Sequence, residues 1–255
     1  MSNRILGIDI GGSGVKGAIV DVRKGEFVSE RIRIPTPSEH TPTNILGAVG
    51  EIIDKLDYSG RIGCGFPGVV RSQVIETAAN LGGKNFIGIN FAEQIGLKFG
   101  CEAWILNDAD AAGIAEMRYG AGKGVKGSVI VMTVGTGIGV SMFIDGILIP
   151  NLEFGHLRMR DKSSGKNTDA EKLYSDAVRK RKDLSWKSWA SGLNKYLQYL
   201  YSLTRPDLII MGGGVSSKRE KFFKYLKVDC DVVAAKLENR AGIIGSAYCA
   251  YSKIK

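Results

Sequence analysis

Apolar and polar positions alternate along the first 34 residues in a pattern that predicts paired β-strands. Residues 4–10, RILGIDI, precede a glycine turn, and residues 17–22, GAIVDV, follow it with many β-branched side chains. Residues 26–34, EFVSERIRI, continue the alternation, so we expect a third antiparallel strand there. The segment is therefore predicted as strand, tight turn, strand and strand.

The turn contains Gly12-x-Gly14-x-x-Gly17, which has the glycine spacing of a dinucleotide-binding turn. That fold requires a helix to begin directly at the glycines. The residues after Gly17 instead form a strand, because Ala18-Ile19-Val20 is followed by a hairpin signal, Arg-Lys-Gly. The pattern therefore argues against a nicotinamide-dependent oxidoreductase.

Further apolar periodicity predicts alternating helices and strands along the rest of the chain. Helices are expected at 42–56, 91–99, 168–182, 185–204 and 241–251, and strands at 61–70, 102–107 and 207–215. Residues 129–149 repeat the order strand, glycine turn, strand.

The second half of the chain repeats the first at a constant offset. When the two halves are aligned with Thr133 at the position of Asp9, Gly135 falls at the position of Gly11, and the offset is 124 residues in both cases. Such a duplication predicts a two-lobed α/β fold with a cleft between the lobes. We expect lobes at 1–106 and 107–255, with the closing helix packing back on the first lobe.

The chain of 255 residues carries a formal net charge of +9, which indicates an anionic partner. Residues 158–187 contain ten Lys or Arg against five Asp or Glu. A solvated helix face and an anion-binding segment explain this local excess equally well.

The N-terminal residues MSNRILGIDI contain too short an apolar stretch for a signal peptide. No apolar run approaches the roughly 20 residues that a membrane-spanning helix needs. We therefore expect a cytoplasmic protein with no membrane partner. Four widely separated cysteines form no C-x-x-C pair and are expected to be buried thiols of a reducing compartment, with no zinc site. They are Cys64, Cys101, Cys230 and Cys249.

The two glycine turns are candidates for binding phosphate, because their backbone N–H groups are not obstructed by side chains. Lys16 adds a positive charge beside the first turn, and Asp9 offers a carboxylate that suits Mg²⁺. A third run, Gly212–Gly214, also follows a predicted strand. The chain has neither a Walker A sequence nor a kinase-type H-R-D triplet, which excludes those phosphate-handling folds.

Polar residues near predicted element ends have both a structural and a functional interpretation. Asp108 is explained by helix N-capping, or by general-base chemistry on an alcohol. Glu171 has capping-box spacing from Thr168, yet lies at the edge of its helix, where it could bind a sugar hydroxyl. Glu153 and His156 stand together in EFGH, in a loop where a histidine is more often structural.

Nine motifs, taken in order, resemble the ROK family of sugar kinases. They are DIGGSGVKGAIVD, GFPG, ETAAN, ILNDADAAG, TVGTGIG, LEFGH, DAEKLYSDA, LIIMGGGVS and NRAGIIGSA. The similarity implies a two-lobed actin/hexokinase-like (ribonuclease H-like) fold. ROK members commonly carry a cysteine-rich zinc segment after the histidine. Residues 155–171 contain no cysteine, which is similar to the polyphosphate-using branch of the family.

The resemblance assigns roles to individual residues. Asp108 would accept the proton of the sugar 6-hydroxyl, and Asp9 would hold Mg²⁺ directly or through water. The sugar site would comprise Gly65, Pro67, Asn80, Asn107, Glu153, His156 and Glu171. The phosphoryl donor would be held by Asp9, Gly11, Gly12, Ser13, Lys16, Thr133, Gly135, Thr136, Gly137, Gly213 and Gly214.

These roles imply in-line phosphoryl transfer from inorganic polyphosphate, and from ATP as a further donor, to glucose. A homodimer is what the family suggests. A basic track for a long polyphosphate is expected from Lys84, Arg118, Lys123, Lys126 and residues 158–187.

Three alternatives stay open at this point. The chain could be a strictly ATP-dependent ROK glucokinase or a kinase of another hexose such as mannose, or it could bind a sugar without turnover. A sugar-sensing repressor is disfavoured, because such regulators begin with a helix-turn-helix and this sequence enters the first hairpin within about five residues. Nucleic acid is therefore not an expected partner.

Overall fold

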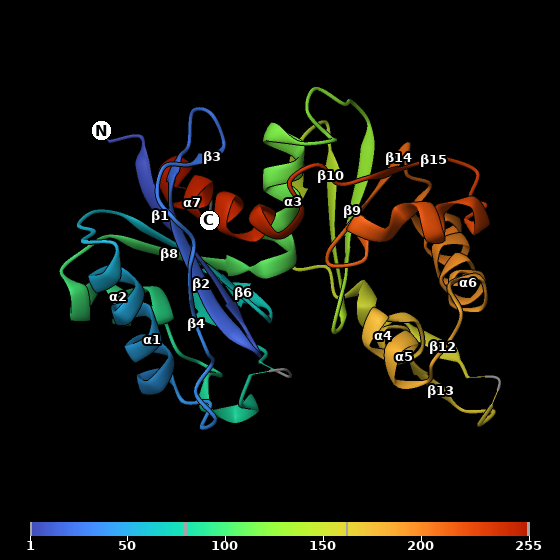
Figure 1. Ribbon diagram of the computed structural model, residues 1–255, viewed down its shortest axis with the longest axis horizontal. Helices are drawn as coiled ribbons and strands as arrows, with labels where there is room; N and C mark the ends of the chain where they lie inside the picture. The colour runs from blue at the N-terminus through green and yellow to red at the C-terminus, as the bar shows by residue number, and fades with distance from the viewer. Residues whose placement is uncertain (1, 79–80, 162, 254–255) are drawn as a thin grey trace. The chain divides into compact units, whose positions relative to one another are not determined.

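The computed structural model describes residues 2–78, 81–161 and 163–253, and divides into two compact units (Figure 1). The first unit comprises Met1–Ala115 and Arg240–Lys255, and the second comprises Glu116–Asn239. The boundary expected at 106/107 therefore has to be moved to 115/116, because the first turns of the helix that begins at Asp108 pack within the first unit. The closing helix also belongs to the first unit.

The first unit contains a six-stranded mixed sheet in which five strands follow the order β3-β2-β1-β5-β8 and the sixth, β4, also pairs with β2. β1 and β2 form the predicted antiparallel hairpin, with Gly11 opposite Gly14, and β5 and β8 run parallel to β1. The expected third strand is two short strands, β3 and β4, which both pair with β2. The strands are β1 (Arg4–Gly11), β2 (Gly14–Asp21), β3 (Glu26–Phe27), β4 (Ile32–Ile34), β5 (Ile62–Phe66) and β8 (Ala103–Asn107).

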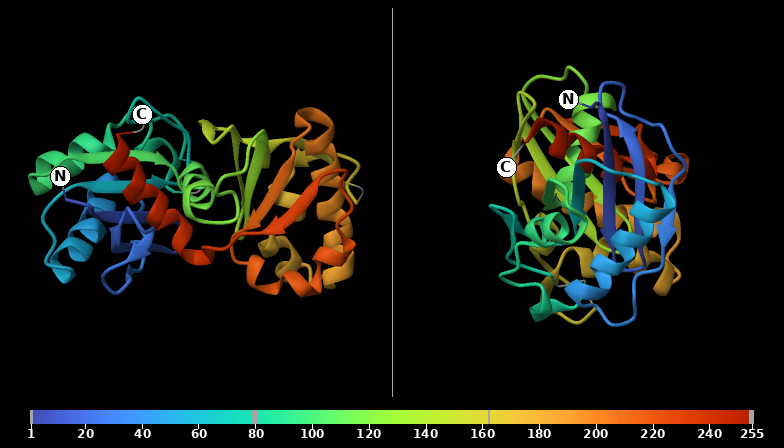
Figure 2. Two further views of the ribbon diagram at one scale, coloured as in Figure 1. Left: turned by 90° about the horizontal axis from the view of Figure 1, so that it is seen from above. Right: turned by 90° about the vertical axis from the view of Figure 1, so that its left-hand side faces the viewer.

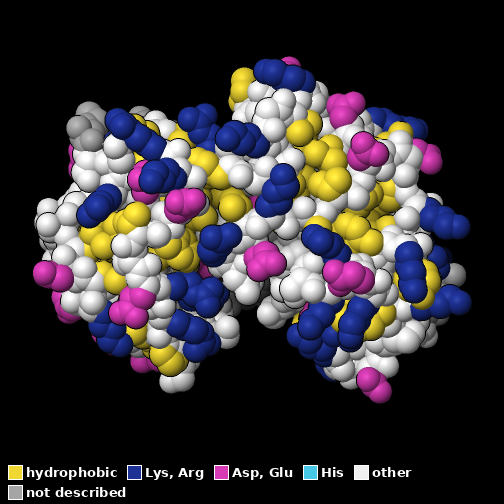
Figure 3. Space-filling model, turned by 45° about the horizontal axis from the view of Figure 1, so that its top comes forward, with side chains coloured by type: hydrophobic (Ala, Val, Ile, Leu, Met, Phe, Trp, Pro, Cys, Tyr) yellow, Lys and Arg dark blue, Asp and Glu magenta, His cyan; other side chains and the backbone are white. Residues whose placement is uncertain are grey.

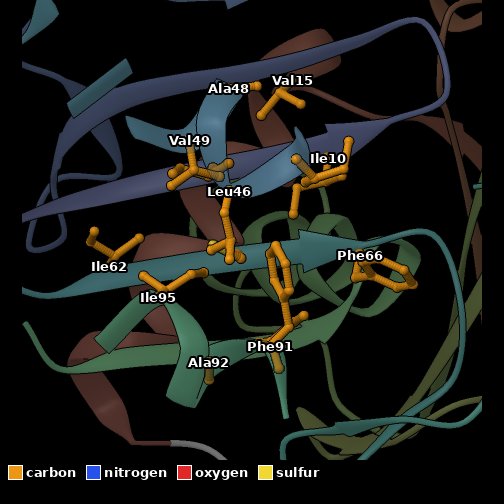
Figure 4. Packing of buried hydrophobic residues seen from close by; sticks show 14 of the residues in the cluster. Ile10, Val15, Leu46, Ala48, Val49, Ile62, Phe66, Phe91, Ala92 and Ile95 are labelled. Atoms are coloured by element: carbon orange, nitrogen blue, oxygen red, sulfur yellow. The ribbon is translucent and has the colours of Figure 1, made fainter. Parts of the chain in front are cut away.

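Two helices, α1 (Pro42–Lys55) and α2 (Phe91–Phe99), cover one face of this sheet (Figure 4). Each helix begins at a side-chain cap: Thr41 accepts a hydrogen bond from the Asn44 amide, and Asn90 accepts one from the Glu93 amide. The apolar stripes of both helices meet alternate residues of β1 and β5, because side chains alternate between the faces of a strand. The β1 and β5 members of this core are Leu6, Ile8, Ile10, Ile62, Cys64 and Phe66.

Helix α7 (Ala241–Ser252) packs on the opposite face of the sheet, where β1 and β5 carry glycine. A Cβ atom at Gly7 would overlap the Ile243 carbonyl, and one at Gly63 would overlap the Ser246 carbonyl. Gly245 of α7 lies equally close to the Ala111 carbonyl of α3 (Asp108–Tyr119). The helix therefore packs backbone to backbone, which only glycine permits at these positions.

Short elements complete the first unit. The predicted strand over 61–70 ends at Phe66, and the chain then forms a small hairpin before α2. These elements are β6 (Val70–Arg71), β7 (Val74–Ile75) and the 3₁₀ turn Gly83–Asn85.

The second unit contains a five-stranded sheet in the order β11-β10-β9-β14-β15. This order reproduces β3-β2-β1-β5-β8, with an antiparallel hairpin followed by two parallel strands, and the predicted internal duplication is confirmed. The strands are β9 (Ser128–Val134), β10 (Ile138–Ile144), β11 (Ile147–Ile149), β14 (Leu208–Gly212) and β15 (Asp231–Ala234).

The long helix α6 (Trp186–Thr204) provides the core of the second unit and begins at the Ser185 cap. Its buried side chains, which include Trp189 and Tyr196, contact alternate residues of β9, β10 and β14. Two views turned by 90° show how the helices of each unit lie on its sheet (Figure 2).

The helix expected over 168–182 is interrupted. Residues Asn167–Asp169 form β13, which pairs with β12 (Arg158–Arg160), and two short helices follow, α4 (Glu171–Tyr174) and α5 (Asp176–Arg181). Ser175 separates them in an extended conformation, with ψ of 159°. The remaining 3₁₀ turns are Phe154–His156, Ser216–Lys221, Phe223–Tyr225 and Glu238–Arg240.

A buried carboxylate holds together the two ends of the second unit. Glu116 is 1% exposed and accepts hydrogen bonds from the amides of Ala121, Lys236 and Leu237 at 2.9, 3.1 and 2.7 Å. These bonds tie the end of α3 to the segment after β15, so the carboxylate is compensated by backbone dipoles. Sequence analysis did not single out this residue.

The cysteines differ from expectation in part. Cys64 and Cys249 are buried, whereas Cys101 and Cys230 are partly exposed, and all four are free thiols. Burial raises the pKa of the Cys249 thiol to about 12, with a smaller contribution from the charge of Asp110.

In the part of the chain that the structure describes, no helix has the length and apolar character needed to cross a bilayer.

The contact between α7 and the sheet predicts a large effect of a single methyl group. We expect Gly63→Ala to destabilise the protein by about 1–3 kcal/mol, because the Ser246 backbone would have to move. Gly47→Ala in α1 is the matched control, since its Cβ would meet no atom within 4 Å and alanine favours the helix. Urea unfolding measures both; equal stability of the two variants would contradict this packing.

Candidate active site

An ion pair lies at the base of the first glycine hairpin. Asp9 of β1 and Lys16 of β2 are directly opposite in the strand register, and Lys16 Nζ lies 3.0 Å from Asp9 Oδ2. Both side chains are partly exposed, at 23% for Asp9 and 29% for Lys16. The hairpin register therefore presents one acid and one base on the same face, beside the turn formed by Gly11, Gly12 and Ser13.

Two side chains hold the turn itself. Thr36 Oγ1 donates to the Gly11 carbonyl, and Arg33 Nη2 donates to the Ser13 carbonyl at 2.6 Å. Arg33 lies on β4, opposite Lys16 in the sheet, so two cations stand side by side at this hairpin. No local sequence signal marks Arg33, because only the pairing of β4 with β2 brings it next to Lys16.

The N-terminal end of α7 approaches Asp9. A Cβ at Gly242 would lie 3.4 Å from Asp9 Oδ1, and no side chain caps this helix end at Arg240. The positive end of a helix dipole stabilises a nearby carboxylate. The helix end and Lys16 thus both face Asp9, whose carboxylate is of the kind that could ligate Mg²⁺ together with substrate phosphates.

Asn107 and Asp108 stand at the junction of β8 and α3. Asn107 Oδ1 accepts a hydrogen bond from the Asp110 amide, so Asn107 rather than Asp108 caps the helix. The capping interpretation of Asp108 is thus wrong. Asp108 is the first helical residue, is partly exposed, and accepts a hydrogen bond from the Ala109 amide at 2.8 Å through Oδ1.

The GFPG segment passes next to this junction. Asn107 Nδ2 donates to the Gly68 carbonyl at 3.0 Å, and a Cβ at Gly65 would lie 3.4 Å from the Asp108 Cα. Pro67, which lies between Gly65 and Gly68 in the sequence, is partly buried. The structure therefore brings together four of the predicted sugar-site and catalytic residues of the first unit, while Asn80 lies outside the described residues.

The second glycine turn connects β9 and β10 and comprises Gly135, Thr136 and Gly137, with Thr133 at the corresponding position of β9. The Gly135 amide donates to the Gly137 carbonyl at 3.0 Å. Gly213 has φ of +77° and touches the Val134 backbone, so this position requires glycine, whereas a Cβ at Gly214 would meet no atom within 4 Å.

His156 is the centre of a cluster of carboxylates in the second unit. Its Nε2 lies 3.2 Å from Glu153 Oε2, and its Nδ1 lies 3.8 Å from Asp169 Oδ2 and 3.9 Å from Glu171 Oε1. Gly155 fixes the 3₁₀ turn, because a Cβ there would overlap the Ile138 carbonyl of β10. The EFGH motif is thereby held against the strand that leaves the second glycine turn.

Glu171 does not form a capping box with Thr168, because Thr168 lies in β13 and α4 begins without a side-chain cap. Instead, its Oε2 accepts a hydrogen bond from the Ile138 amide at 3.4 Å and would lie 2.5 Å from a Cβ at Gly137. The predicted sugar-site residue Glu171 and the predicted donor-site residue Gly137 are thus neighbours.

Buried aromatic residues support this cluster from below. The Tyr196 hydroxyl donates to the Phe154 carbonyl, and Trp189 Nε1 donates to the Tyr174 carbonyl at the end of α4. Burial is the main cause that raises the pKa of Tyr196, so its hydroxyl remains a hydrogen-bond donor. Helix α6 therefore fixes both segments that carry the acidic residues.

Two carboxyl groups of the cluster have shifted pKa values of opposite sign. Burial, the largest cause, raises the pKa of Glu153; His156 lowers it and Glu171 raises it further. Hydrogen bonds from Lys172 and Arg158 lower the pKa of Asp169. Carboxyl groups beside an imidazole offer hydrogen-bond acceptors and donors, which suits recognition of a polyhydroxylated ligand.

Across the described ranges, no three His, Cys, Asp or Glu side chains are grouped so as to hold a metal ion on their own. Asp9 could take part in binding Mg²⁺ in a different way, as a single carboxylate that would share the ion with phosphate oxygens.

Comparison with known proteins gives one family. The model of the ROK family matches residues 5–172. A polyphosphate glucokinase from Mycobacterium tuberculosis is 42% identical over 243 residues, which cover 95% of this chain and 89% of the relative.

Solved structures agree with this result. Inorganic polyphosphate/ATP-glucomannokinase from Arthrobacter sp. strain KM is 38% identical, with a TM-score of 0.92 and coverage of 99% of this chain and 100% of that chain. A ROK family glucokinase from Streptomyces griseus, solved with glucose and AMPPNP, has a TM-score of 0.83 at 23% identity over 98% of this chain and 99% of that chain. The predicted α/β class of the actin/hexokinase-like type is confirmed.

The environment of Glu153 predicts an elevated titration. We expect its pKa to lie above the ordinary glutamate value, to rise further in His156→Ala and to fall in Glu171→Gln, because these residues have opposite electrostatic effects on it. The native state then retains the Glu153 proton to higher pH than the unfolded state. This group's contribution to stability therefore decreases as pH rises from the unfolded through the native pKa. Carboxyl NMR titration measures the three values, and an ordinary Glu153 pKa in all three proteins would contradict the prediction.

Proposed function

The chain belongs to the ROK family, and from this premise we propose that it transfers the terminal phosphoryl group of inorganic polyphosphate to the 6-hydroxyl of glucose, giving glucose 6-phosphate. The observation that carries the proposal is the 42% identity, over 95% of the chain, to a polyphosphate glucokinase. The arrangement of the candidate residues within each unit supports it.

Asp108 is the proposed general base. It stands where β8 ends and α3 begins, a position fixed by the Asn107 cap, and the Ala109 amide orients its carboxylate. A positioned carboxylate that takes the hydroxyl proton makes the sugar oxygen a better nucleophile. A Cβ at Gly65 would lie 3.1 Å from Ser246 Oγ and 3.4 Å from the Asp108 Cα, so glycine at this position lets β5 pack closely against the start of α3.

The glycine turns and the Asp9–Lys16 pair are proposed to hold the donor. Backbone N–H groups at Gly11, Gly12 and Ser13 would bind phosphate oxygens, as would those of Thr136 and Gly137 in the second turn and those of Gly213 and Gly214. Lys16 would neutralise charge on the donor. Mg²⁺, when bound at Asp9, would supply further charge neutralisation on the phosphates.

The sugar is proposed to bind through side chains that accept and donate hydrogen bonds. In the second unit these are Glu153, His156 and Glu171, which lie within ion-pair distance of one another through the imidazole. The resemblance also assigns Asn107, Gly65, Pro67 and Asn80 to sugar binding.

ATP is proposed as a second donor and mannose as a second acceptor. The Arthrobacter relative is described as an inorganic polyphosphate/ATP-glucomannokinase, and it aligns over 99% of this chain. Among the alternatives, a kinase that uses only ATP has the least support from this likeness.

The proposal includes the cytoplasm as the place of action, in keeping with four free thiols. A homodimer is proposed on the family resemblance.

The function is tested by measuring glucose 6-phosphate formation with Mg²⁺ and either long-chain polyphosphate or ATP. We expect activity with both donors, and glucose binding without turnover of either would overturn the proposal.

Asp108→Asn should lower kcat by about 10²–10⁴-fold, the usual contribution of general acid–base catalysis, and leave the KM for glucose nearly unchanged. Asp54→Asn, an exposed change in α1, is the control and should retain full activity. Circular dichroism and thermal unfolding check that both variants are folded.

Lys16 generates a separate prediction for the donor. Lys16→Gln should raise the KM for polyphosphate and ATP by about tenfold or more, since it removes a cation and leaves Asp9 unpaired near the phosphates. The KM for glucose should change little. Lys24→Gln, an exposed lysine after β2, is the matched control. Equal donor KM values for the two variants would remove Lys16 from the site.

A further inference from the structure

Lys and Arg side chains predominate over Asp and Glu on the face shown in Figure 3, but charge alone does not say which of them act together. In the second unit, two basic segments from distant parts of the sequence meet at one tryptophan. Arg179 of α5 lies over the Trp186 ring at 4.0 Å, and Lys221 of the 3₁₀ turn Ser216–Lys221 lies over the same ring at 5.9 Å. Trp186 is stacked on the buried Phe222. The two segments are therefore held together by the core.

Both segments begin at glycines of the proposed donor site. The amide of Ala177 in α5 donates to the Gly135 carbonyl at 3.1 Å. The other segment follows Gly213 and Gly214 directly, and its Ser216 amide donates to the Gly213 carbonyl at 3.1 Å. Each segment thus leads away from a phosphate-binding turn toward Trp186.

Part of the positive charge at this place is compensated and part is not. Asp176 forms ion pairs with Arg179 and Lys180 at 2.7 and 2.8 Å, and Glu220 Oε1 lies 3.7 Å from Arg219 Nε. Lys182 has an acidic neighbour at longer range in Asp161, and among described residues no ion pair joins an acidic side chain to the exposed cations that remain. They are Arg181, Lys182, Lys218 and Lys221.

The length of the two segments sets the distance from the donor site. Arg181 and Lys182 follow Ala177, the contact of Gly135, by four and five residues, which span about 6–8 Å of helix. Lys218 and Lys221 follow Gly214 by four and seven residues, in a 3₁₀ segment that is kinked at Lys218. The four cations therefore lie several residues beyond the glycines, where a long phosphate chain reaches further than a short one.

We propose that Arg181, Lys182, Lys218 and Lys221 form a distal subsite for the chain of long polyphosphates. We call these four residues the Trp186 patch. The proposal rests on the proposed function and adds to it a location for the part of the donor that does not react. It also narrows the basic track expected from the sequence, because Lys84 lies in the first unit, and Arg118, Lys123 and Lys126 lie on α3 and the loop that follows it.

The patch gives long donors an affinity that short donors do not share. Binding of a polyanion to several cations releases counterions, so it weakens as salt concentration rises, and each lost contact reduces the salt dependence. A compact donor occupies only the glycine turns and the Asp9–Lys16 pair, and is insensitive to the patch.

The test is a triple variant, Lys182→Gln, Lys218→Gln and Lys221→Gln, compared with wild type. We expect the KM for long-chain polyphosphate to rise about tenfold or more, and its log–log slope against salt to decrease by about 2, for three lost phosphate contacts. The KM for glucose and the KM or inhibition constant of tetrapolyphosphate should stay within about twofold. The matched control replaces three exposed lysines of the first unit, Lys24, Lys55 and Lys98, by glutamine and should behave as wild type.

The outcomes separate the subsite from the function. If wild type forms no glucose 6-phosphate from polyphosphate, the proposed function fails; if wild type is active and the triple variant matches it with long chains, the subsite fails. Loss of activity with every donor would show damage to the glycine turns and would also overturn a distal role. A wild-type patch that bound duplex DNA more tightly than polyphosphate, measured by competition, would assign it to nucleic acid instead.

Discussion

The first unit depends on close backbone contact between α7 and the sheet. Gly7 and Gly63 occupy the face of β1 and β5 that meets the helix, and any side chain there would displace Ile243 or Ser246. The same alternation that places Leu6 and Ile8 in the core under α1 and α2 places Asp9 on the α7 side. The alternation of side chains along β1 thus determines both how α7 packs and where Asp9 lies. The helix can approach the sheet because of the glycines, and its N-terminal end then reaches Asp9.

Much of this could be predicted from the sequence, for identifiable reasons. The hairpin was evident from β-branched residues after Gly17, and the structure adds why glycine stands there, since a Cβ would lie 2.8 Å from Ile52 of α1. The duplication was evident from the offset between Asp9 and Thr133, and both sheets have the same strand order. These features are local or repeated, so they are visible as patterns in the amino-acid sequence itself.

What the sequence left undetermined depends on contacts between distant segments. The capping role fell to Asn107 rather than to Asp108, because Asp108 is already the first helical residue, and the Asn107 side chain is also held by the Gly68 carbonyl. The spacing of Thr168 and Glu171 suggested a capping box, but pairing of β13 with β12 removes Thr168 from the helix and frees Glu171 to reach Ile138. Arg33 could not be found without the register of β4. In each case a tertiary contact determined the outcome over a local preference.

The two hairpins show how a duplicated unit acquires two functions. In the first, the residue opposite Asp9 is Lys16, and the acid–base pair lies beside an open turn. In the second, the residue opposite Thr133 is Gly139, so this position has no charge, and Glu171 approaches the turn at Gly137 from another segment. The first hairpin therefore carries its own charges, whereas the second obtains them from the segments that α6 holds against it. The carboxylate cluster around His156 and the basic segments at Trp186 both belong to this second unit. There the turn is surrounded by added structure, namely α4, α5 and the turn Phe154–His156, for which the first unit has no counterpart among its described elements.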